Sequence, residues 1–180
     1  MRILDGLWKN RSLDAPKGIR PMTEMVKQAM FNVLGNLAGL SVLDLFSGSG
    51  QLGIETLSRG AQFAAFVEKE RRNADHIRDA LKSLDVSAVS ARVLALDARA
   101  YLSRTGTSFD LILMDPPYEQ GLVGPCLAAI ADHVDILNAG GRLVLRHTKH
   151  EPVDETAMVS LESEFTRCYG DDILRIWRKH

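Results

Sequence analysis

Apolar residues recur along this chain with two spacings, one typical of helices and one typical of buried strands. Spacings of three and four residues predict amphipathic helices, whereas short apolar runs bounded by glycine, proline or acidic residues predict strands. The predicted helices cover residues 24–37, 51–59, 71–84, 97–102 and 122–136. The predicted strands cover residues 42–46, 64–68, 91–96, 109–115, 142–146, 164–169 and 173–177. Strands and helices therefore alternate through most of the chain.

This alternation predicts an α/β fold with one mostly parallel sheet of seven strands. Strands joined by helices run parallel, and the helices cover both faces of the sheet. The last two strands are joined only by Gly170, Asp171 and Asp172, a combination that favours a hairpin. We therefore expect an antiparallel edge at the carboxyl end and a single domain over residues 23–180.

Residues 1–22 are rich in turn-forming residues, and we interpret them as a basic N-terminal arm. Residues 2–27 include six basic and three acidic side chains, with Trp8 among them. Positive charge beside an aromatic ring suits phosphates and bases, so Lys9 and Arg11 are candidate contacts to nucleic acid. An equally open interpretation is a solvated arm that Trp8 anchors onto the domain.

Composition narrows the class of protein. The chain has 180 residues, 46% of them hydrophobic, which suits one α/β domain with a substantial core. Its 22 basic and 23 acidic residues exclude a uniformly basic coat but leave room for a local basic patch. We find neither a signal peptide nor an apolar stretch of bilayer length, and we expect a cytoplasmic protein. The two cysteines and five histidines show no metal-ligand spacing, and we interpret His147 and His150 as solvated residues beyond a strand end.

The stretch VLDLFSGSGQLG, residues 42–53, joins a predicted strand directly to a helix. Its residues Gly48, Gly50 and Gly53 permit a sharp turn, a close approach of the backbone to a ligand and tight helix packing. Glu68 follows at the end of the next strand, where an acidic residue can reach a ribose hydroxyl. The spacing alone predicts a nucleoside site, although glycine-rich turns of this kind also occur without a ligand.

Polar and acidic residues gather where the predicted strands end. Asp44, Gly48, Glu68, Asp97 and Asp115 all lie at or just past a strand end. Ligands of doubly wound sheets bind beyond the carboxyl ends of the strands, so all five are candidate site residues. For Asp97, capping of the following helix is an equal alternative.

The tetrapeptide Asp115-Pro116-Pro117-Tyr118 ends a predicted strand, residues 109–115, that is nearly all apolar and therefore buried on both faces. Two consecutive prolines give a rigid turn that offers carbonyl acceptors and no N–H donors. The Asp115 carboxylate and the Pro116 carbonyl can both accept hydrogen bonds from one planar amino group, beside the flat face of Tyr118. This arrangement predicts a site for a nucleobase with an exocyclic amine, the alternative being a proline turn with a packed tyrosine.

These motifs together resemble those of class I S-adenosylmethionine-dependent amino-methyltransferases. The segments RILDGLWKNRSL, RPMTEMVKQAMFNVL and LGIETLSRGA are similar, more closely, to the bacterial RsmD-type 16S rRNA guanine-N2 methyltransferases. The resemblance covers nearly the whole chain and implies a Rossmann-like class I methyltransferase fold. It implies methyl transfer from S-adenosylmethionine to the N2 amine of a guanine in 16S rRNA, within the small ribosomal subunit or an assembly intermediate. Neither a metal nor a membrane is implied.

The resemblance also implies a role for each motif. The implied cofactor-binding residues are Asp44, Phe46, Gly48, Gly50, Glu68, Asp97 and Ala98. The implied catalytic residues, which would hold the target amine and base, are Asp115, Pro116 and Tyr118. The implied substrate-binding residues are Lys9, Arg11, Arg20, Thr23, Pro117 and Tyr118.

Three other functions fit parts of the same pattern. An adenine-N6 methyltransferase acting on DNA or RNA needs the same planar-amine site. A nicotinamide-dependent dehydrogenase shares the glycine spacing and Glu68, but hydride transfer requires neither Asp44 nor the Asp-Pro-Pro-Tyr turn. A non-enzymatic RNA-binding protein would account for the basic arm alone.

Overall fold

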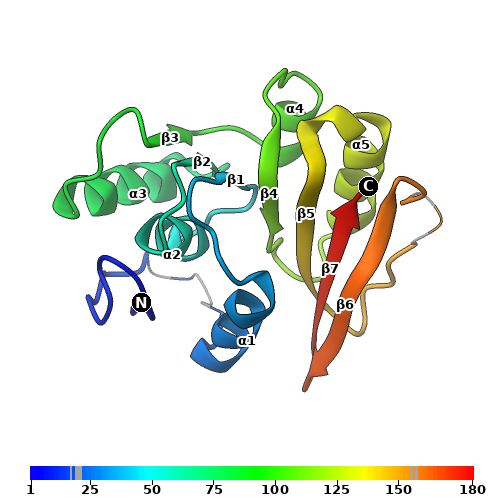
Figure 1. Ribbon diagram of the computed structural model, residues 1–180, viewed down its shortest axis with the longest axis horizontal. Helices are drawn as coiled ribbons and strands as arrows, with labels where there is room; N and C mark the ends of the chain where they lie inside the picture. The colour runs from blue at the N-terminus through cyan, green and yellow to red at the C-terminus, as the bar shows by residue number, and fades with distance from the viewer. Residues whose placement is uncertain (17, 19–21, 155, 157) are drawn as a thin grey trace.

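A computed structural model of the chain describes residues 1–16, 18, 22–154, 156 and 158–180. This part of the chain forms one seven-stranded sheet in the order β3-β2-β1-β4-β5-β7-β6 (Figure 1). The strands are β1 (Ser41–Asp44), β2 (Phe63–Val67), β3 (Ala91–Leu94), β4 (Phe109–Met114), β5 (Leu137–Thr148), β6 (Leu161–Tyr169) and β7 (Asp172–Lys179). The first five strands run parallel, and β7 is antiparallel to both β5 and β6. The predicted parallel sheet with an antiparallel C-terminal hairpin is confirmed.

Helices cover both faces of the sheet, as predicted (Figure 1). They are α1 (Glu24–Leu34), α2 (Gln51–Ser58), α3 (Arg71–Ser83), α4 (Ala98–Leu102), α5 (Val123–Asp132) and the 3-10 helix η1 (Val134–Ile136). Helices α1 to α3 share one hydrophobic cluster with Val42, and α4 and α5 share another with its neighbour Leu43, because successive strand residues face opposite sides. Among the described residues, none of the helices combines the length and apolar character needed to cross a bilayer.

Two predicted helices differ from the structure by more than one residue. Helix α1 ends at Leu34 instead of residue 37, because Gly35 adopts φ 67° and closes the helix. The residue at 37 is a buried leucine that packs beyond the helix, so its apolar character fitted the helical spacing by coincidence. The helix predicted over residues 122–136 divides into α5 and η1, since His133 leaves the helical region with φ −119° and ψ 53°.

Strand β5 is also longer than the predicted 142–146, because it pairs with β4 on one side and with β7 on the other. His147, which we expected to be solvated, therefore lies inside the sheet and is only 2% exposed. Its Nδ1 lies 2.9 Å from the Thr148 carbonyl oxygen, and its Nε2 accepts a hydrogen bond from Arg175 Nε at 3.1 Å. Arg175 comes from β7, so this partner depends on strand pairing that the local sequence does not reveal.

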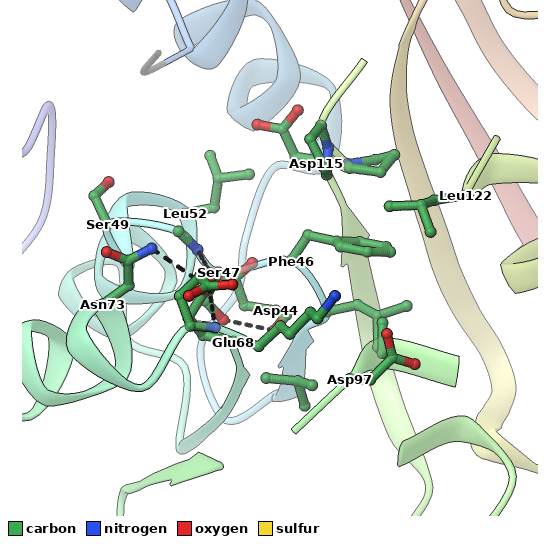
Figure 2. A pocket seen from close by; sticks show the side chains of 18 of the residues that line it. Asp44, Phe46, Ser47, Ser49, Leu52, Glu68, Asn73, Asp97, Asp115 and Leu122 are labelled. Atoms are coloured by element: carbon green, nitrogen blue, oxygen red, sulfur yellow. Dashed lines mark hydrogen bonds between the residues drawn. The ribbon is translucent and has the colours of Figure 1, made fainter. Parts of the chain in front are cut away.

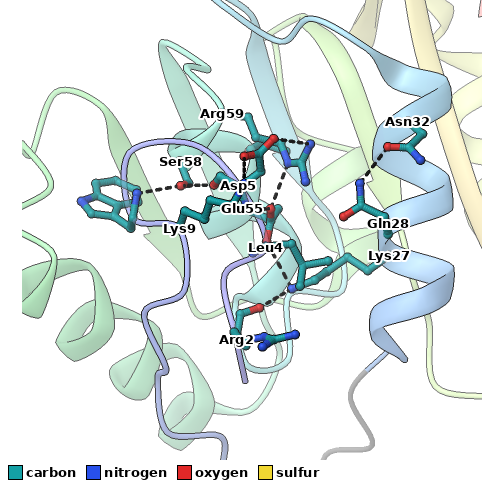
Figure 3. A network of polar contacts seen from close by, with 12 residues as sticks. Arg2, Leu4, Asp5, Lys9, Lys27, Gln28, Asn32, Glu55, Ser58 and Arg59 are labelled. Carbon is teal, nitrogen blue, oxygen red and sulfur yellow. Dashed lines mark hydrogen bonds and ion pairs between the residues drawn. The ribbon is translucent and has the colours of Figure 1, made fainter.

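The N-terminal arm is docked on α2 through a buried glutamate (Figure 3). The Glu55 carboxylate accepts hydrogen bonds from the backbone N–H groups of Leu4 and Asp5 at 2.9 and 3.0 Å. Two cations also meet it, Lys27 through Nζ at 3.2 Å and Arg59 through Nε at 2.9 Å. Glu55 is 0% exposed and Lys27 is 2% exposed, so this charged cluster is part of the interior.

Trp8 anchors the arm and does not project from it. Its side chain packs, partly buried, against the hydrophobic cluster of α1 to α3, and its backbone N–H donates to Ser58 Oγ at 3.0 Å. Lys9 and Arg11 remain exposed on the arm. The anchoring interpretation of Trp8 is therefore confirmed, and contacts from Lys9 and Arg11 to nucleic acid stay a prediction.

Candidate functional site

A cavity of about 520 Å³ opens where β1, β2 and β4 end at the same edge of the sheet. Figure 2 shows Glu68 and Asp97 on one side of the Phe46 ring and Asp115 on the other. The predicted site residues that line the cavity are Asp44, Phe46, Gly48, Glu68, Asp97, Ala98, Asp115, Pro116, Pro117 and Tyr118. The glycine loop and the Asp-Pro-Pro-Tyr turn are therefore two walls of one cavity.

The loop between β1 and α2 is shaped by left-handed glycines. Gly48 has φ 54° and Gly50 has φ 77°, a region where other residues are strained. The Gly48 N–H donates to Glu68 Oε2 at 2.7 Å, which fastens the loop to the end of β2. Gly53 lets α2 approach the sheet, since a Cβ at this position would lie 2.3 Å from Phe66 Cε1. The loop backbone therefore borders the cavity in one fixed conformation.

Asp44 is a buried carboxyl at the floor of the cavity, with 1% exposure. Its Oδ2 accepts a hydrogen bond from the Gly53 N–H at 2.9 Å, whereas Oδ1 is buried with no hydrogen-bond partner among the described residues. Burial raises the pKa of Asp44 to about 7, with smaller contributions from the negative charges of Asp115 and Glu68. The unpaired oxygen is therefore suited to accept a hydrogen bond from a cationic ligand.

Glu68 and Asp97 already have backbone partners at the rim of the cavity. Glu68 Oε1 accepts from the Glu70 N–H at 2.8 Å, so each oxygen of Glu68 has a backbone donor and Oε2 alone holds the glycine loop. Asp97 Oδ1 caps α4 by accepting from the Arg99 and Ala100 N–H groups at 3.0 and 3.2 Å. The two interpretations of Asp97 are thus compatible, because the same residue caps a helix and lines the cavity.

A network of charged side chains from the ends of β4, β5 and β7 holds the Asp-Pro-Pro-Tyr turn. Arg146, two residues before the end of β5, donates two hydrogen bonds to the Asp115 carboxylate, Nε to Oδ1 at 2.7 Å and Nη2 to Oδ2 at 3.0 Å. Its Nη1 donates to Asp172 Oδ2 of β7 at 3.4 Å. Asp172 Oδ1 accepts from the Tyr118 hydroxyl at 2.9 Å, and this bond extends the network to a chain of four side chains.

Sequence reasoning missed Arg146 and Asp172. The available signal was Arg146 itself, a charged residue that ends the apolar run of a predicted buried strand. Asp172 gave no such signal, since acidic residues are common in hairpin turns. Further cavity residues that were not predicted include Lys69, Asn73 and Leu122.

Some predicted site residues lie outside the cavity. Gly50 is the residue before α2 and packs against Ile77. Thr23 caps α1, its Oγ1 accepting from the Val26 N–H at 3.4 Å. Arg20 lies outside the described residues. The predicted roles of these residues and of those in the cavity remain predictions.

The chain is similar in sequence and in fold to proteins of one family. Residues 1–178 match the family described as Conserved hypothetical protein 95. The chain is 36% identical to the Bacillus subtilis protein YlbH over 162 residues, 87% of each chain. It is 35% identical to Ribosomal RNA small subunit methyltransferase D of Escherichia coli over 136 residues, 74% of this chain and 68% of that one. The solved structure of the Escherichia coli protein yhhF superposes with a TM-score of 0.88 at 28% identity, covering 100% and 98% of the two chains.

The family match over residues 1–178 spans the arm, the glycine loop and the Asp-Pro-Pro-Tyr turn together, so it concerns the whole site. The sheet order, with its antiparallel β7 between β5 and β6, agrees with the predicted methyltransferase fold. A nicotinamide-dependent dehydrogenase, which the glycine spacing had left open, is excluded by these relatives. By its sequence over residues 1–178 and by its fold, the chain belongs to the RsmD family of class I S-adenosylmethionine-dependent methyltransferases.

Proposed function

We propose that this methyltransferase modifies the exocyclic N2 amine of a guanine in the 16S rRNA of the small ribosomal subunit. The observation that carries the proposal is the shared cavity, in which the Asp-Pro-Pro-Tyr turn faces the glycine loop across Phe46. The Escherichia coli relative, named for the small subunit, supports ribosomal RNA as the substrate class.

The residues of the cavity fit the cofactor. Asp44 presents a buried unpaired oxygen for the ammonium of the methionine part, and the backbone from Phe46 to Gly50 surrounds that part. Glu68 is proposed to bind the ribose hydroxyls, and Asp97 with the Ala98 amide is proposed to read the adenine. When bound, S-adenosylmethionine supplies a sulfonium methyl: the amine nitrogen takes the methyl group, the electron pair of the S–C bond stays on sulfur, and one N–H proton is released.

The Asp-Pro-Pro-Tyr turn is proposed to prepare the amine for this attack. The lone pair of an exocyclic amine is delocalised into the base, which makes the nitrogen a poor nucleophile. When Asp115 and the Pro116 carbonyl accept its two N–H groups, the nitrogen moves toward tetrahedral geometry and its lone pair is aimed at the methyl group. The base must leave its stack to enter the cavity, and Tyr118 replaces the lost stacking partner.

The affinity for the cofactor should depend on pH through Asp44. The cofactor ammonium favours the ionised carboxylate, whose pKa in the free protein is about 7. Below that pH a proton competes with the ligand, so we expect affinity for S-adenosylhomocysteine to fall from pH 8 to pH 6, by at most about tenfold per pH unit. Calorimetric titration measures this. Asp44→Asn should bind S-adenosylhomocysteine more weakly and lose the pH dependence, whereas Asp97→Asn should keep the pH dependence. A wild-type affinity that does not change between pH 6 and pH 8 would disprove this role of Asp44.

The exposed arm is proposed to contact RNA phosphates. Lys9→Glu with Arg11→Glu should weaken RNA binding by about tenfold or more. The slope of log affinity against log salt concentration should also fall, by the equivalent of about two phosphate contacts. Affinity for S-adenosylhomocysteine should be unchanged, because neither residue lines the cavity. The control is Arg167→Glu with Arg178→Glu, an equal change of charge at the β6–β7 edge. Equal RNA affinity in wild type and the Lys9 and Arg11 variant would refute the proposal.

Adenine-N6 methylation in DNA or RNA is the second candidate, because the turn suits any planar exocyclic amine. The two acceptor classes can be compared directly by offering unmodified ribosomal RNA and DNA together with a labelled methyl donor. The proposed function predicts that the label enters RNA alone. Nucleoside analysis of both fractions then separates the two candidates, since N6-methyladenosine in either the RNA or the DNA would favour the second.

A further inference from the structure

Arg146 occupies the position on β5 that faces the predicted catalytic carboxylate. Strands β4 and β5 run side by side and parallel, with Met114 opposite Leu145, so the next residue on each strand is Asp115 and Arg146 (Figure 1). The guanidinium is only 7% exposed and bonds both Asp115 oxygens in a two-pronged geometry, at 2.7 and 3.0 Å. Such a pair fixes both the position and the rotation of a carboxylate.

The same guanidinium supports the other end of the turn. Its Nη1 contacts Asp172, which accepts the Tyr118 hydroxyl, and its Cζ lies 5.2 Å from the centroid of the Tyr118 ring. Asp172 is held in place by the pairing of β7 with β5. One arginine therefore ties the first and last residues of the Asp-Pro-Pro-Tyr turn to the antiparallel edge of the sheet.

Charge explains why a cation is needed at this place. Burial raises the pKa of the Asp115 carboxyl, and Asp172 adds to the rise, whereas the Arg146 guanidinium opposes it. The charged and titratable groups around Asp115 are Arg146 on β5, Asp172 on β7, Asp44 on β1 and Tyr118 on its own turn. A protonated Asp115 would be a donor and would lose part of its capacity to accept an amine.

We propose that Arg146 is a positioning residue for methyl transfer, which holds the Asp115 carboxylate ionised and oriented so that its remaining lone pairs accept the target amine. An ionised carboxylate has about four acceptor sites, and the two prongs of Arg146 occupy two of them. Asp172 is the second support, since it fixes Arg146 and Tyr118 together. The inference rests on the proposed function, in which Asp115 binds the amine.

The test is the pH profile of the single-turnover transfer rate in Arg146→Met, with cofactor and RNA saturating. We expect the rate to fall about 100-fold, the usual cost of a misplaced catalytic group. The acid limb of the profile should move up by about one to three pH units, because Asp115 loses its counter-charge. Arg146→Lys keeps the charge without the two prongs, so it should restore the position of the acid limb more fully than the rate.

Arg142→Met is the matched control. Arg142 lies on the same strand and grips Glu164 with a similar fork, at 2.8 and 2.7 Å, but it lines no part of the cavity. Arg142→Met removes a similar ion pair from β5 and leaves the partners of Asp115 unchanged. The acid limb of its pH–rate profile should therefore stay at the wild-type position. An acid limb that moves equally in both variants, or in neither, would overturn the positioning role.

A second measurement needs no methyl transfer. Carbon-13 NMR of protein labelled at the aspartate carboxyls follows the ionisation of Asp115, whose signal is identified by its loss in Asp115→Asn. Arg146→Met should raise the pKa of Asp115 by about one unit or more, and an unchanged titration would reject the inference. The nucleoside that the wild type methylates tests the proposed function separately, so failure of one claim is distinguishable from failure of the other.

Discussion

Asp115→Ala is expected to abolish methyl transfer while cofactor binding persists. Asp115 lies on the wall of the cavity opposite Glu68, and in the proposed function it accepts the amine without holding the cofactor. Loss of a preorganised group that acts in the transition state typically costs about 10²- to 10³-fold in rate, so no transfer should be detected on the timescale of the wild-type reaction. Single-turnover transfer of a labelled methyl group measures the rate, and calorimetry with S-adenosylhomocysteine measures the binding.

Two comparisons separate the role of the Asp115 charge from its effect on the fold. Asp115→Asn keeps the shape and one carbonyl acceptor, so its rate should lie between those of wild type and Asp115→Ala. Arg146 retains Asp172 as a partner in either variant, which limits the destabilisation. Loss of transfer and cofactor affinity together in Asp115→Asn, with the fold intact, would contradict the division of the cavity into two roles.

Of the substitutions considered, Glu55→Ala is expected to lower the free energy of unfolding the most. The carboxylate receives two backbone N–H groups of the arm and two cations, and it is fully buried. Burial lowers the pKa of Lys27 and Glu55 opposes this effect, so removal of Glu55 leaves a buried ammonium without its counter-charge. Breaking a buried pair from one side costs about 3–5 kcal/mol. At about 2–4 °C per kcal/mol for a domain of this size, thermal unfolding should begin well below the wild-type temperature.

The control for Glu55 is Glu24→Gln. Glu24 also joins the arm to the domain, through Arg2 at 2.6 Å, but the two side chains are about half exposed, at 53% and 51%. An exposed pair contributes at most about 1 kcal/mol, so this variant should unfold close to wild type. Hydrogen exchange at the amides of Leu4 and Asp5 should accelerate in Glu55→Ala alone. A melting temperature for Glu55→Ala equal to that of Glu24→Gln would show that Glu55 does not hold the arm.

The parts of the fold that depend on local pattern could be predicted from sequence. The apolar run from residue 109 to 114 marked β4, and the glycines after β1 marked the turn into α2, because each signal is contained in a short segment. The hairpin followed from Gly170 and its neighbours in the same way. Element order then determined which side chains meet at the edge of the sheet, so the main cavity residues could be predicted before any geometry was known.

What sequence could not reveal depends on pairing between distant segments. The contact of Arg146 with Asp115 requires the register of β4 against β5, and its contact with Asp172 requires the antiparallel return of β7. Glu55 looks like a surface residue of an amphipathic helix, and the docked arm together with Lys27 of α1 makes it internal. His147 was misjudged for the same reason, since the strand that buries it lies far along the chain.

The most direct test of the proposed function is transfer of a labelled methyl group from S-adenosylmethionine to unmodified small ribosomal subunits, followed by nucleoside analysis. We expect N2-methylguanosine as the labelled product, with no label in a reaction that contains Asp115→Ala. Labelled N6-methyladenosine would retain the amine chemistry of the cavity and contradict guanine as the target base. No transfer to subunits or to their free RNA, by a protein that binds S-adenosylhomocysteine, would contradict ribosomal RNA as the substrate.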